Sequence, residues 1–538
     1  MREYNVALNK DVDYDEFWND MESDTDGGKL YIPNRRVEFT NERPASLRQC
    51  WYLLTDEEAE TLRNDDRVYC VEIPPEQRDD LIMVRNAIQI SNFTKTSADS
   101  GSFVNWGLKR TISQLNNYGT GTTPTETPNE YPYTLTGKGV DVVIQDSGLQ
   151  VDHPEFQDEN GTSRVQQINW STESGVSFTQ NANHYRDFNG HGTHCAGITA
   201  GKTYGWAKSA RVYSQKLSGL EGTGDSGTGI SATFAFDAIK GWHNNKPKDP
   251  TTGFKRPTVV NMSWGYLDAY NTVSSIYYRG ASTTTNISTA ALRQTNYGLI
   301  NFSGAGYGFN FLTNVRVSSV DTDIEEMVDA GIVVCVAAGN RSHKIDVVGG
   351  IDYNNYVVTD QGNLYYHRGS SPRSERAITV GNIDSSIRPP ASEQKAASSE
   401  CGPGVDIYAP GTNIMSACST TNEFTDEPYY LNSSYRQMNI SGTSMASPQV
   451  AGVAALLLEM NPSTSPQQIK QALTNIAGDG ILYTTITTPP ASDWDDTRSL
   501  QDGKNKFLYF KFANNTSLEI KGQFDKYPNF VKLKQKIQ

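Results

Sequence analysis

Long apolar segments are absent from the sequence, which has 538 residues and a mean hydropathy of −0.56. No run approaches the roughly 18 apolar residues that a membrane-spanning helix needs, so we expect no membrane span. The first residues, MREYNVALNKD, also lack the apolar core of a secretory signal peptide. We therefore expect a protein that is intracellular, exported by a non-classical route or carried inside a particle, and the sequence leaves these three locations open.

Cysteine is also scarce, with six residues in the whole chain. So few thiols in a chain of this length do not form the disulfide framework of a small secreted domain. Two individual disulfides stay open at this point, Cys50 with Cys70 and Cys401 with Cys418.

Positive charge is outweighed by negative charge, and the net charge is −14. Such an acidic chain gives no reason to expect nucleic acid as a partner. The charge is uneven, because residues 1–76 hold 19 acidic and 9 basic residues, whereas the chain from Gly503 onward holds eight lysines and two acidic residues. A solvated lysine-rich surface explains this basic tail, and a contact with the acidic head or with an anionic partner is the alternative.

The length of the chain predicts two or three domains. Residues 1–76 have the short strand and helix patterns of a small α+β domain, and residues 77–103 form a linker. Between residues 104 and 477, apolar strand-like runs alternate with helical stretches, at 140–144, 211–217, 258–262, 332–337, 377–380 and 405–408. Such runs predict a mostly parallel sheet that helices cover on both faces. Two polar insertions, near 266–317 and 342–373, interrupt this domain, and residues 478–538 form a C-terminal extension with the basic tail.

A run of small residues, Ile-Ser-Gly-Thr-Ser-Met-Ala-Ser-Pro, surrounds Ser444 and precedes an apolar helical segment. Pro448 suits the first turn of a helix, so the pattern places Ser444 at the positive end of a buried helix. A serine nucleophile needs such a position, with backbone donors aimed at the developing oxyanion. Taken alone, the run is also typical of a Ser/Thr helix cap.

Two further segments favour the nucleophile. Asp146 ends the apolar run Val-Asp-Val-Val-Ile-Gln-Asp, which predicts a buried parallel strand that delivers a carboxylate at its carboxyl edge. His191 begins the run His-Gly-Thr-His-Cys-Ala-Gly, which predicts a tightly packed helix. A metal site formed by His191, His194 and Cys195 is the alternative for this second segment.

Together the three motifs, in the order Asp, His and Ser, resemble those of the subtilisin-like serine proteases (subtilases, peptidase S8 family). They are most similar to the proteinase K branch, through residues 190–197, residues 203–208 and the segment Trp-Gly-Leu at 106–108. The resemblance covers about residues 104–477. It implies an α/β, subtilisin-like three-layer domain with a mostly parallel sheet, preceded by a small α+β (ferredoxin-like) propeptide-type domain in residues 1–76.

The resemblance also implies a serine endopeptidase that acts on proteins or peptides and is made as a propeptide-bearing precursor. Ser444 is the expected nucleophile, His191 the general base and then acid, and Asp146 the group that orients the imidazole. Asn340 matches the side chain that donates to the oxyanion, and His194 matches a structural histidine. The N-terminal domain would act as an intramolecular inhibitor or chaperone, and a self-processing cut would fall in residues 77–103.

We expect the substrate to bind as an extended strand between two backbone edges. The expected substrate-binding residues are Ser263, Trp264 and Gly265 on one edge, Ser226, Gly227 and Thr228 on the other, and Ala338 and Gly339 before the oxyanion residue. Relatives commonly have leucine at the position of Trp264, so we expect an aromatic wall near the primary pocket.

No cofactor is expected for the chemistry itself. Asp406 resembles the residue that gives a structural calcium ligand in proteinase K, with carbonyl groups near Glu375 and Ala377 as companions. One carboxylate with carbonyls and water suits this cation. A polar turn residue without a metal is the alternative.

A protein of another class fits the same sequence, namely a structural or assembly protein that carries a subtilase domain, for example within a virus particle. The two insertions, the basic tail and the missing signal peptide motivate this alternative. A catalytically inactive scaffold is disfavoured because the catalytic set is complete.

Overall fold

The computed structural model describes residues 1–22, 37, 39–43, 45–46, 48–85, 106–112, 133, 135–250, 253–303, 308–387, 393–483, 494 and 496–510. Within these ranges, no helix is long and apolar enough to cross a membrane. Most of the predicted linker and most of the basic tail lie outside the described residues.

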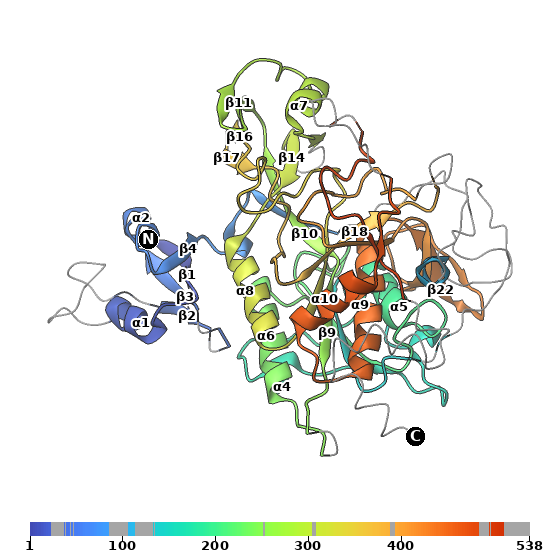
Figure 1. The fold of residues 1–538 in the computed structure, drawn as a ribbon. Coiled ribbons are helices and arrows are strands. Elements are labelled where there is room, and N and C mark those ends of the chain that lie inside the picture. Colours follow the sequence, from blue (N-terminus) through green and yellow to red (C-terminus); the bar gives the residue numbers. More distant parts are fainter. Residues whose placement is uncertain are drawn as a thin grey trace.

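The first domain is a small α+β unit that lies at one side of the main body in Figure 1 and contacts it through Arg43. Its elements are β1 (Arg2–Leu8), α1 (Tyr14–Glu22), β2 (Phe39–Glu42), β3 (Gln49–Leu54), α2 (Asp56–Arg63) and β4 (Val68–Glu72). The antiparallel sheet has the order β2-β3-β1-β4, which confirms the predicted ferredoxin-like, split βαβ arrangement. Thr55 begins α2 through a capping box with Glu58. The short strand β2 was not predicted.

The main body is built on a nine-stranded sheet with the order β23-β24-β19-β18-β15-β9-β6-β8-β7. Its strands are β6 (Asp141–Asp146), β7 (Val165–Gln166), β8 (Arg211–Lys216), β9 (Thr258–Met262), β15 (Val333–Ala337), β18 (Ile378–Ile383), β19 (Ile407–Pro410), β23 (Gly478–Asp479) and β24 (Lys506–Phe507). All neighbours are parallel except β23 and β24. The mostly parallel sheet is therefore confirmed, and part of the C-terminal extension adds two strands to it.

Helices cover both faces of this sheet, which gives the predicted three layers. One face packs against α3 (Trp106–Ile112), α5 (His191–Ala200), α9 (Thr443–Met460) and α10 (Pro466–Ile476). The other packs against α4 (Trp170–Ser174), α6 (Ala232–Asn245) and α8 (Ser318–Asp329). Helix α9 is apolar all round and buried along most of its length, as expected for a helix in the middle of the body.

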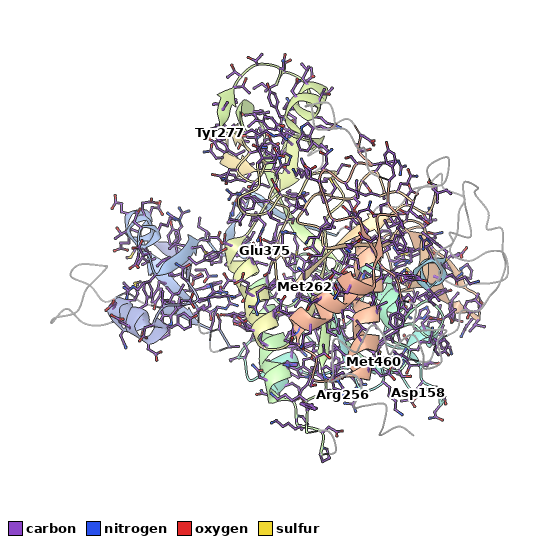
Figure 2. The ribbon with its side chains drawn as sticks, in the orientation of Figure 1. Asp158, Arg256, Met262, Tyr277, Glu375 and Met460 are labelled. Atoms are coloured by element: carbon purple, nitrogen blue, oxygen red, sulfur yellow. The ribbon has the colours of Figure 1, made fainter. Side chains whose placement is uncertain are left out.

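The two insertions combine into one lobe at the top of Figure 1. The first contains β10 (Trp264–Tyr270), β11 (Val273–Tyr278), β12 (Ala281–Thr283), α7 (Ala290–Tyr297), β13 (Phe302–Ser303) and β14 (Phe311–Asn314), and the second contains β16 (Tyr356–Thr359) and β17 (Gly362–Tyr365). Strand β11 pairs with β16, so the sheet β12-β11-β16-β17 joins both insertions. Figure 2 shows Tyr277 of β11 in this lobe, well away from Met262 at the end of β9.

The remaining elements lie outside the large sheet, the helices that cover it and the lobe. They are η1 (Pro75–Gln77), β5 (Leu81–Arg85), η2 (Pro154–Phe156) and a three-stranded sheet of β20 (Ile414–Cys418), β21 (Glu427–Tyr429) and β22 (Asn432–Ile440). Strand β5, which lies within the predicted linker, pairs with β10 in the sheet β13-β14-β10-β5.

Neither disulfide that the sequence left open is formed. Cys50 on β3 and Cys70 on β4 lie on opposite sides of β1, opposite Val6 and Ala7. Two strand spacings of about 4.8 Å separate their backbones, which exceeds the reach of a disulfide. Cys401 and Cys418 are buried free thiols.

Candidate active site

Asp146 ends β6 at the carboxyl edge of the sheet and is fully buried. One carboxylate oxygen, Oδ1, accepts a hydrogen bond from the backbone N–H of Ser147 at 2.7 Å. The same oxygen lies 2.8 Å from Nδ1 of His191. The strand therefore delivers the carboxylate to the imidazole, as the sequence predicted.

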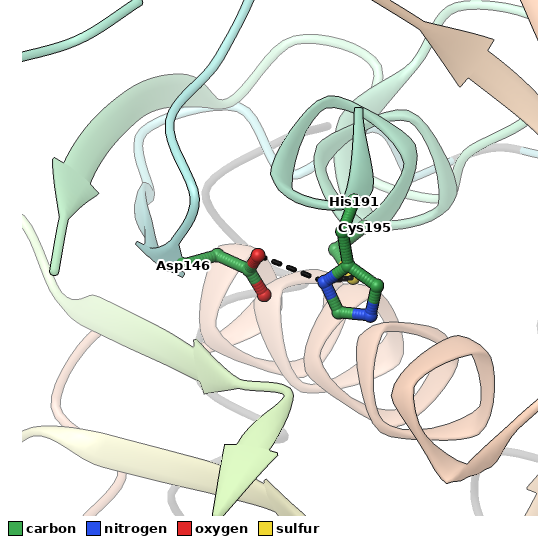
Figure 3. A group of neighbouring side chains, drawn as sticks. All are labelled: Asp146, His191 and Cys195. Atoms are coloured by element: carbon green, nitrogen blue, oxygen red, sulfur yellow. Dashed lines mark hydrogen bonds and ion pairs between the residues drawn. The ribbon is translucent and has the colours of Figure 1, made fainter. Parts of the chain in front are cut away.

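His191 is the first residue of α5, and its side chain has no exposed surface. Helix α5 can approach β6 closely because Gly192 lies against Gly148, where a Cβ would meet the Gly148 carbonyl oxygen at 2.1 Å. This close packing is the reason for the small residues around His191. Figure 3 shows the imidazole facing the Asp146 carboxylate from above α9.

Cys195, one turn after His191, lies behind the imidazole in the view of Figure 3. Its sulfur is 3.8 Å from Nδ1 of His191 and 3.4 Å from the backbone carbonyl oxygen of Ser444. Asp146, His191 and Cys195 place one ligand atom each within 4.8 Å of the others. Burial raises the pKa of the Cys195 thiol well above its ordinary value. The metal alternative also needed His194, which does not belong to this group.

His194 points away from the site, into the body. Its Nε2 atom lies 2.9 Å from the carbonyl oxygen of Ile414 and 3.1 Å from that of Met438. Burial lowers the pKa of His194 to about 3, so the ring is neutral and donates a hydrogen bond from Nε2. The role of a structural histidine matches this geometry.

Ser444 lies in the first turn of α9, at the positive end of the helix. Its Oγ atom donates to the carbonyl oxygen of Ser263 at 3.0 Å, and Ser263 Oγ donates to the carbonyl oxygen of Ser444 at 3.0 Å. Nε2 of His191 has no hydrogen-bond partner among the described residues. The buried Nε2 atom is thus available to a hydroxyl group, and Cys195 contacts both His191 and Ser444 from below.

The predicted oxyanion residue, Asn340, lies beside the nucleophile segment. Its Oδ1 atom accepts from the backbone N–H of Thr443 at 2.9 Å and from Thr443 Oγ1 at 3.1 Å. Because Oδ1 is held in this way, the Nδ2 group is the part of the amide that remains as a donor. Gly339 donates from its backbone N–H to Thr443 Oγ1 at 3.1 Å, and Ala338 pairs with Val380.

The edge predicted at residues 263–265 is paired with β5. The antiparallel register places Trp264 opposite Arg85, Gly265 opposite Val84 and Leu267 opposite Ile82. The expected aromatic wall is turned inward, because the indole of Trp264 is 1% exposed and packs near Phe236 and Tyr266.

On the other side of β5, Gly219 lies near Met83, where a Cβ on Gly219 would be 3.8 to 3.9 Å from the Met83 side chain. Ser226 and Gly227 are exposed residues of a turn, and Thr228 accepts a hydrogen bond at Oγ1 from Lys216 Nζ at 2.9 Å. The role of residues 226–228 in substrate binding therefore stays a prediction.

The oxygen atoms that we expected to bind calcium do lie together, but the ammonium group of a lysine lies among them. Nζ of Lys470 is 2.7 Å from Asp406 Oδ2, 2.6 Å from the Glu375 carbonyl oxygen and 2.7 Å from the Ala377 carbonyl oxygen. Lys504 Nζ lies 2.8 Å from Asp406 Oδ1. Burial alone would raise the pKa of Asp406, but Lys470 and Lys504 lower it. With Lys470 and Lys504 in these positions, Asp406 and the two carbonyl groups do not fit a calcium ion.

Two acidic residues near the site were not singled out from the sequence. Asp187 accepts from the backbone N–H groups of Asn189 and Gly190, at 3.0 and 2.8 Å, and so holds the start of α5. Glu400 lies against Gly339, where a Cβ would be 2.8 Å from its Cγ atom. Burial raises the pKa of Glu400 to about 7. Asp187 in the segment Arg-Asp-Phe-Asn-Gly-His carries a turn signal, whereas no local pattern marks Glu400.

Comparisons with known proteins agree with this geometry. A family model described as "Subtilase family" matches residues 137–509. The chain is 29% identical over 362 residues to a "Cuticle-degrading serine protease" of Arthrobotrys oligospora, covering 67% of this chain and 62% of that protein. It is 28% identical over 429 residues to an "Extracellular serine proteinase" of Thermus sp., covering 80% and 70% respectively.

Among solved structures, the chain is similar to fervidolysin from Fervidobacterium pennivorans, which is described as a keratinolytic enzyme related to subtilisin. The TM-score is 0.52 at 16% identity, and the match covers 96% of this chain and 61% of that one. This likeness concerns the fold. The chain spans less than two thirds of the length of the Arthrobotrys relative and of this structure.

Proposed function

Because the chain belongs to the subtilase family, we propose that it is a serine endopeptidase made as a self-inhibited precursor. The observation that carries the catalytic part is the 2.8 Å contact between Asp146 Oδ1 and His191 Nδ1 in a fully buried site. This contact fixes the imidazole so that its second nitrogen, Nε2, is the proton acceptor. Ser444 supplies the hydroxyl group at the start of α9.

The reaction then proceeds through an acyl-enzyme. Ser444 Oγ turns from the Ser263 carbonyl to His191 Nε2, loses its proton to that nitrogen and attacks the substrate carbonyl carbon. Nδ2 of Asn340 and the backbone N–H of Ser444 stabilise the oxyanion. His191 then donates the proton to the leaving amine, and water reverses the sequence to release the acid. Asp146 stabilises the transient imidazolium ion throughout.

The precursor part of the proposal is supported by strand β5, which lies on the cleft edge where a substrate strand would lie. Five residues of β5 pair with β10, from Leu81 opposite Asp268 to Arg85 opposite Trp264. A substrate that binds by strand addition needs the same backbone N–H and C=O groups. The pairing therefore excludes substrate while β5 remains in place.

Two carboxylates hold the N-terminal domain on the body by capping helices. Glu72 accepts from the backbone N–H groups of Ser318 and Ser319 at 3.2 and 3.0 Å, at the start of α8. Glu76 accepts from Ser231 Oγ at 2.6 Å at the start of α6. Neither helix has a side-chain cap from its own N-cap residue, so both helix termini are stabilised by the first domain.

A fluorophosphonate probe, which reacts with activated serines, tests the proposal on the full chain. We expect the wild type to be labelled and Ser444→Ala to be unlabelled, and Asp146→Asn to react at least about 10⁴-fold more slowly. Mass spectrometry of the wild type should show a new N-terminus within residues 86–103, and this cut should be missing in Ser444→Ala. Equal labelling of Ser444→Ala, or no labelling of any form, would overturn the assignment.

A further inference from the structure

The first insertion lengthens the edge on which an extended peptide can bind. Strand β10 starts at the cleft residue Trp264 and continues six residues further, to Tyr270 in the lobe. On one side it pairs with β5, and on the other with β14, where Leu267 is opposite Asn314 and Ala269 is opposite Leu312. Figure 1 shows β10 leading from the body up to β14 in the lobe. The edge therefore belongs partly to the body and partly to the lobe.

The side chains of β5 alternate between these two parts, as the period of a strand requires. Leu81 and Met83 pack against the apolar cluster of the body that contains Trp264 and Tyr266. Ile82 points to the other side of the sheet. It packs against the cluster of Leu267, Ala269 and Leu312, and Phe309 packs against the same cluster. All four of these residues come from the first insertion.

We propose that these four residues, here called the lobe subsite, form an additional substrate subsite that selects a large apolar side chain. The inference rests on the proposed endopeptidase function. The position that it selects is the one opposite Leu267, three residues before the residue opposite Trp264 along the peptide. The substrate class is thus an extended peptide segment with a branched or large apolar residue at that position.

The composition of the lobe subsite supports this assignment. Leu267, Ala269 and Leu312 are 1%, 0% and 3% exposed with Ile82 in place. When β5 leaves, the apolar surface that Ile82 covers becomes exposed, together with the unpaired backbone edge of β10. An incoming strand satisfies the backbone groups, and an apolar side chain at this position removes the same surface from water.

The test uses fluorogenic peptides that copy residues 80–90, DLIMVRNAIQI, from the chain itself. Three peptides are compared: the native sequence, the Ile82→Ala form and the Met83→Ala form. The enzymes are the full-length wild type and Leu312→Ala, and a fluorophosphonate titration counts the open active sites in each. Met83 provides the matched control, since its side chain packs on the body and not on the lobe.

We expect Ile82→Ala to lower kcat/KM about tenfold with the wild type, as loss of most of a buried isoleucine side chain implies. With Leu312→Ala the same change should cost about threefold or less, because the wall that contacts the side chain is gone. Met83→Ala should lower kcat/KM equally with both enzymes. An equal loss for Ile82→Ala with both enzymes, or no loss with the wild type, would overturn the lobe subsite.

A second variant and a shorter peptide keep these outcomes distinct. Ala269→Leu fills the lobe subsite, so it should reverse the preference and favour the Ile82→Ala peptide, even where Leu312→Ala does not fold. A peptide that begins at Met83 lacks the selected position, and both enzymes should cleave it equally well. If this short peptide is cleaved while the Ile82 effect is missing, only the lobe subsite fails. If it is not cleaved and Ser444 is unlabelled, the proposed function fails as well.

Discussion

Lys470 and Arg43 are cationic side chains that lie among oxygen atoms, and they belong to different domains of the molecule. Lys470 on α10 lies among Asp406 and two carbonyl groups of the same body. Arg43 belongs to the N-terminal domain, and its guanidinium lies 2.9 Å from Asp237 on α6 and 2.7 Å from Asp323 on α8. The first cation stays with the body permanently, whereas the second is present only while the first domain is docked.

Arg43 is surrounded by groups from both domains. Burial opposes the charge of Arg43, but Asp237 and Asp323 raise its pKa, and Gln49 accepts a third hydrogen bond at 2.7 Å. When the domain leaves, Asp237 and Asp323 keep Lys240 as a neighbouring cation and regain contact with water. The buried ion pairs thus stabilise the docked state, and Lys240 and water stabilise the two carboxylates after undocking. Both properties suit the proposed release of this domain.

Loss of the Arg43 guanidinium should have the largest effect on the docked state. Removing one partner of a buried ion pair costs about 3–5 kcal/mol, so Arg43→Ala should raise the rate of fluorophosphonate labelling of Ser444 in the full chain by about 10²–10³-fold. Lys10→Ala is the matched control at the same interface. Its ion pair with Glu325, at 3.1 Å, is partly exposed, so labelling should change about fivefold or less. Similar labelling rates for Arg43→Ala and Lys10→Ala would contradict the idea that the buried ion pairs of Arg43 hold the domain on the body.

Glu400 is a buried carboxyl group that, unlike Asp237, Asp323 and Asp406, accepts hydrogen bonds from neutral donors. These donors are the Asn314 side chain at 2.7 Å and the Arg341 backbone N–H at 3.2 Å. Burial raises the pKa of Glu400 from 4.5 to about 7. The stability that its protonated form contributes is therefore complete below pH 4.5 and is lost as the pH rises through about 7. We expect Glu400→Gln to remove this loss and to be more stable than wild type above neutral pH by roughly 3 kcal/mol.

Denaturant unfolding of wild type and Glu400→Gln across this pH range measures the difference. Glu60→Gln is the control, since Glu60 is exposed and forms an ion pair within α2. If the free energy of unfolding changes with pH in the same way for wild type and Glu400→Gln, ionisation of Glu400 does not destabilise the folded state, and the prediction is wrong.

Substitution of Lys470 should have a smaller effect on stability and a qualitative effect on metal binding. Lys470→Ala removes one of two cations from Asp406, so we expect a loss of about 2 kcal/mol. The carboxylate and the carbonyl groups of Glu375 and Ala377 would then face a space without an ammonium group, which suits a hard cation. Calcium should therefore raise the Tm of Lys470→Ala and leave that of the wild type unchanged.

Lys504→Ala provides the control for this prediction, because Lys504 contacts the other oxygen of Asp406 and its side chain is 48% exposed. Its loss should cost about 1 kcal/mol or less and should not create a calcium response. A wild-type Tm that rises with calcium as much as that of Lys470→Ala would contradict replacement of the metal by lysine.

Most of the catalytic site could be predicted because each of its parts is a contiguous motif. Asp146 ends an apolar strand and His191 begins a run of small residues, and both patterns are visible within ten residues. The two lysines beside Asp406 could not be predicted, for the opposite reason. The oxygens near Asp406 were identified correctly, but Lys470 lies 64 residues further along the chain, and no local pattern indicates that its ammonium group reaches them.

The three-layer body, six strands of its sheet and the residues of the proposed triad could be predicted from the residues alone, because strand and helix periodicity and small-residue packing are local properties. Contacts between groups that are distant along the chain could be seen only in the folded structure. The fold pairs β5 with β10 and joins both insertions into one lobe. It also brings Arg43 into contact with Asp237, 194 residues away along the chain, and places Lys470 where a metal was expected. Long-range contacts depend on how whole elements pack, and packing selects partners by shape and charge rather than by their distance along the chain.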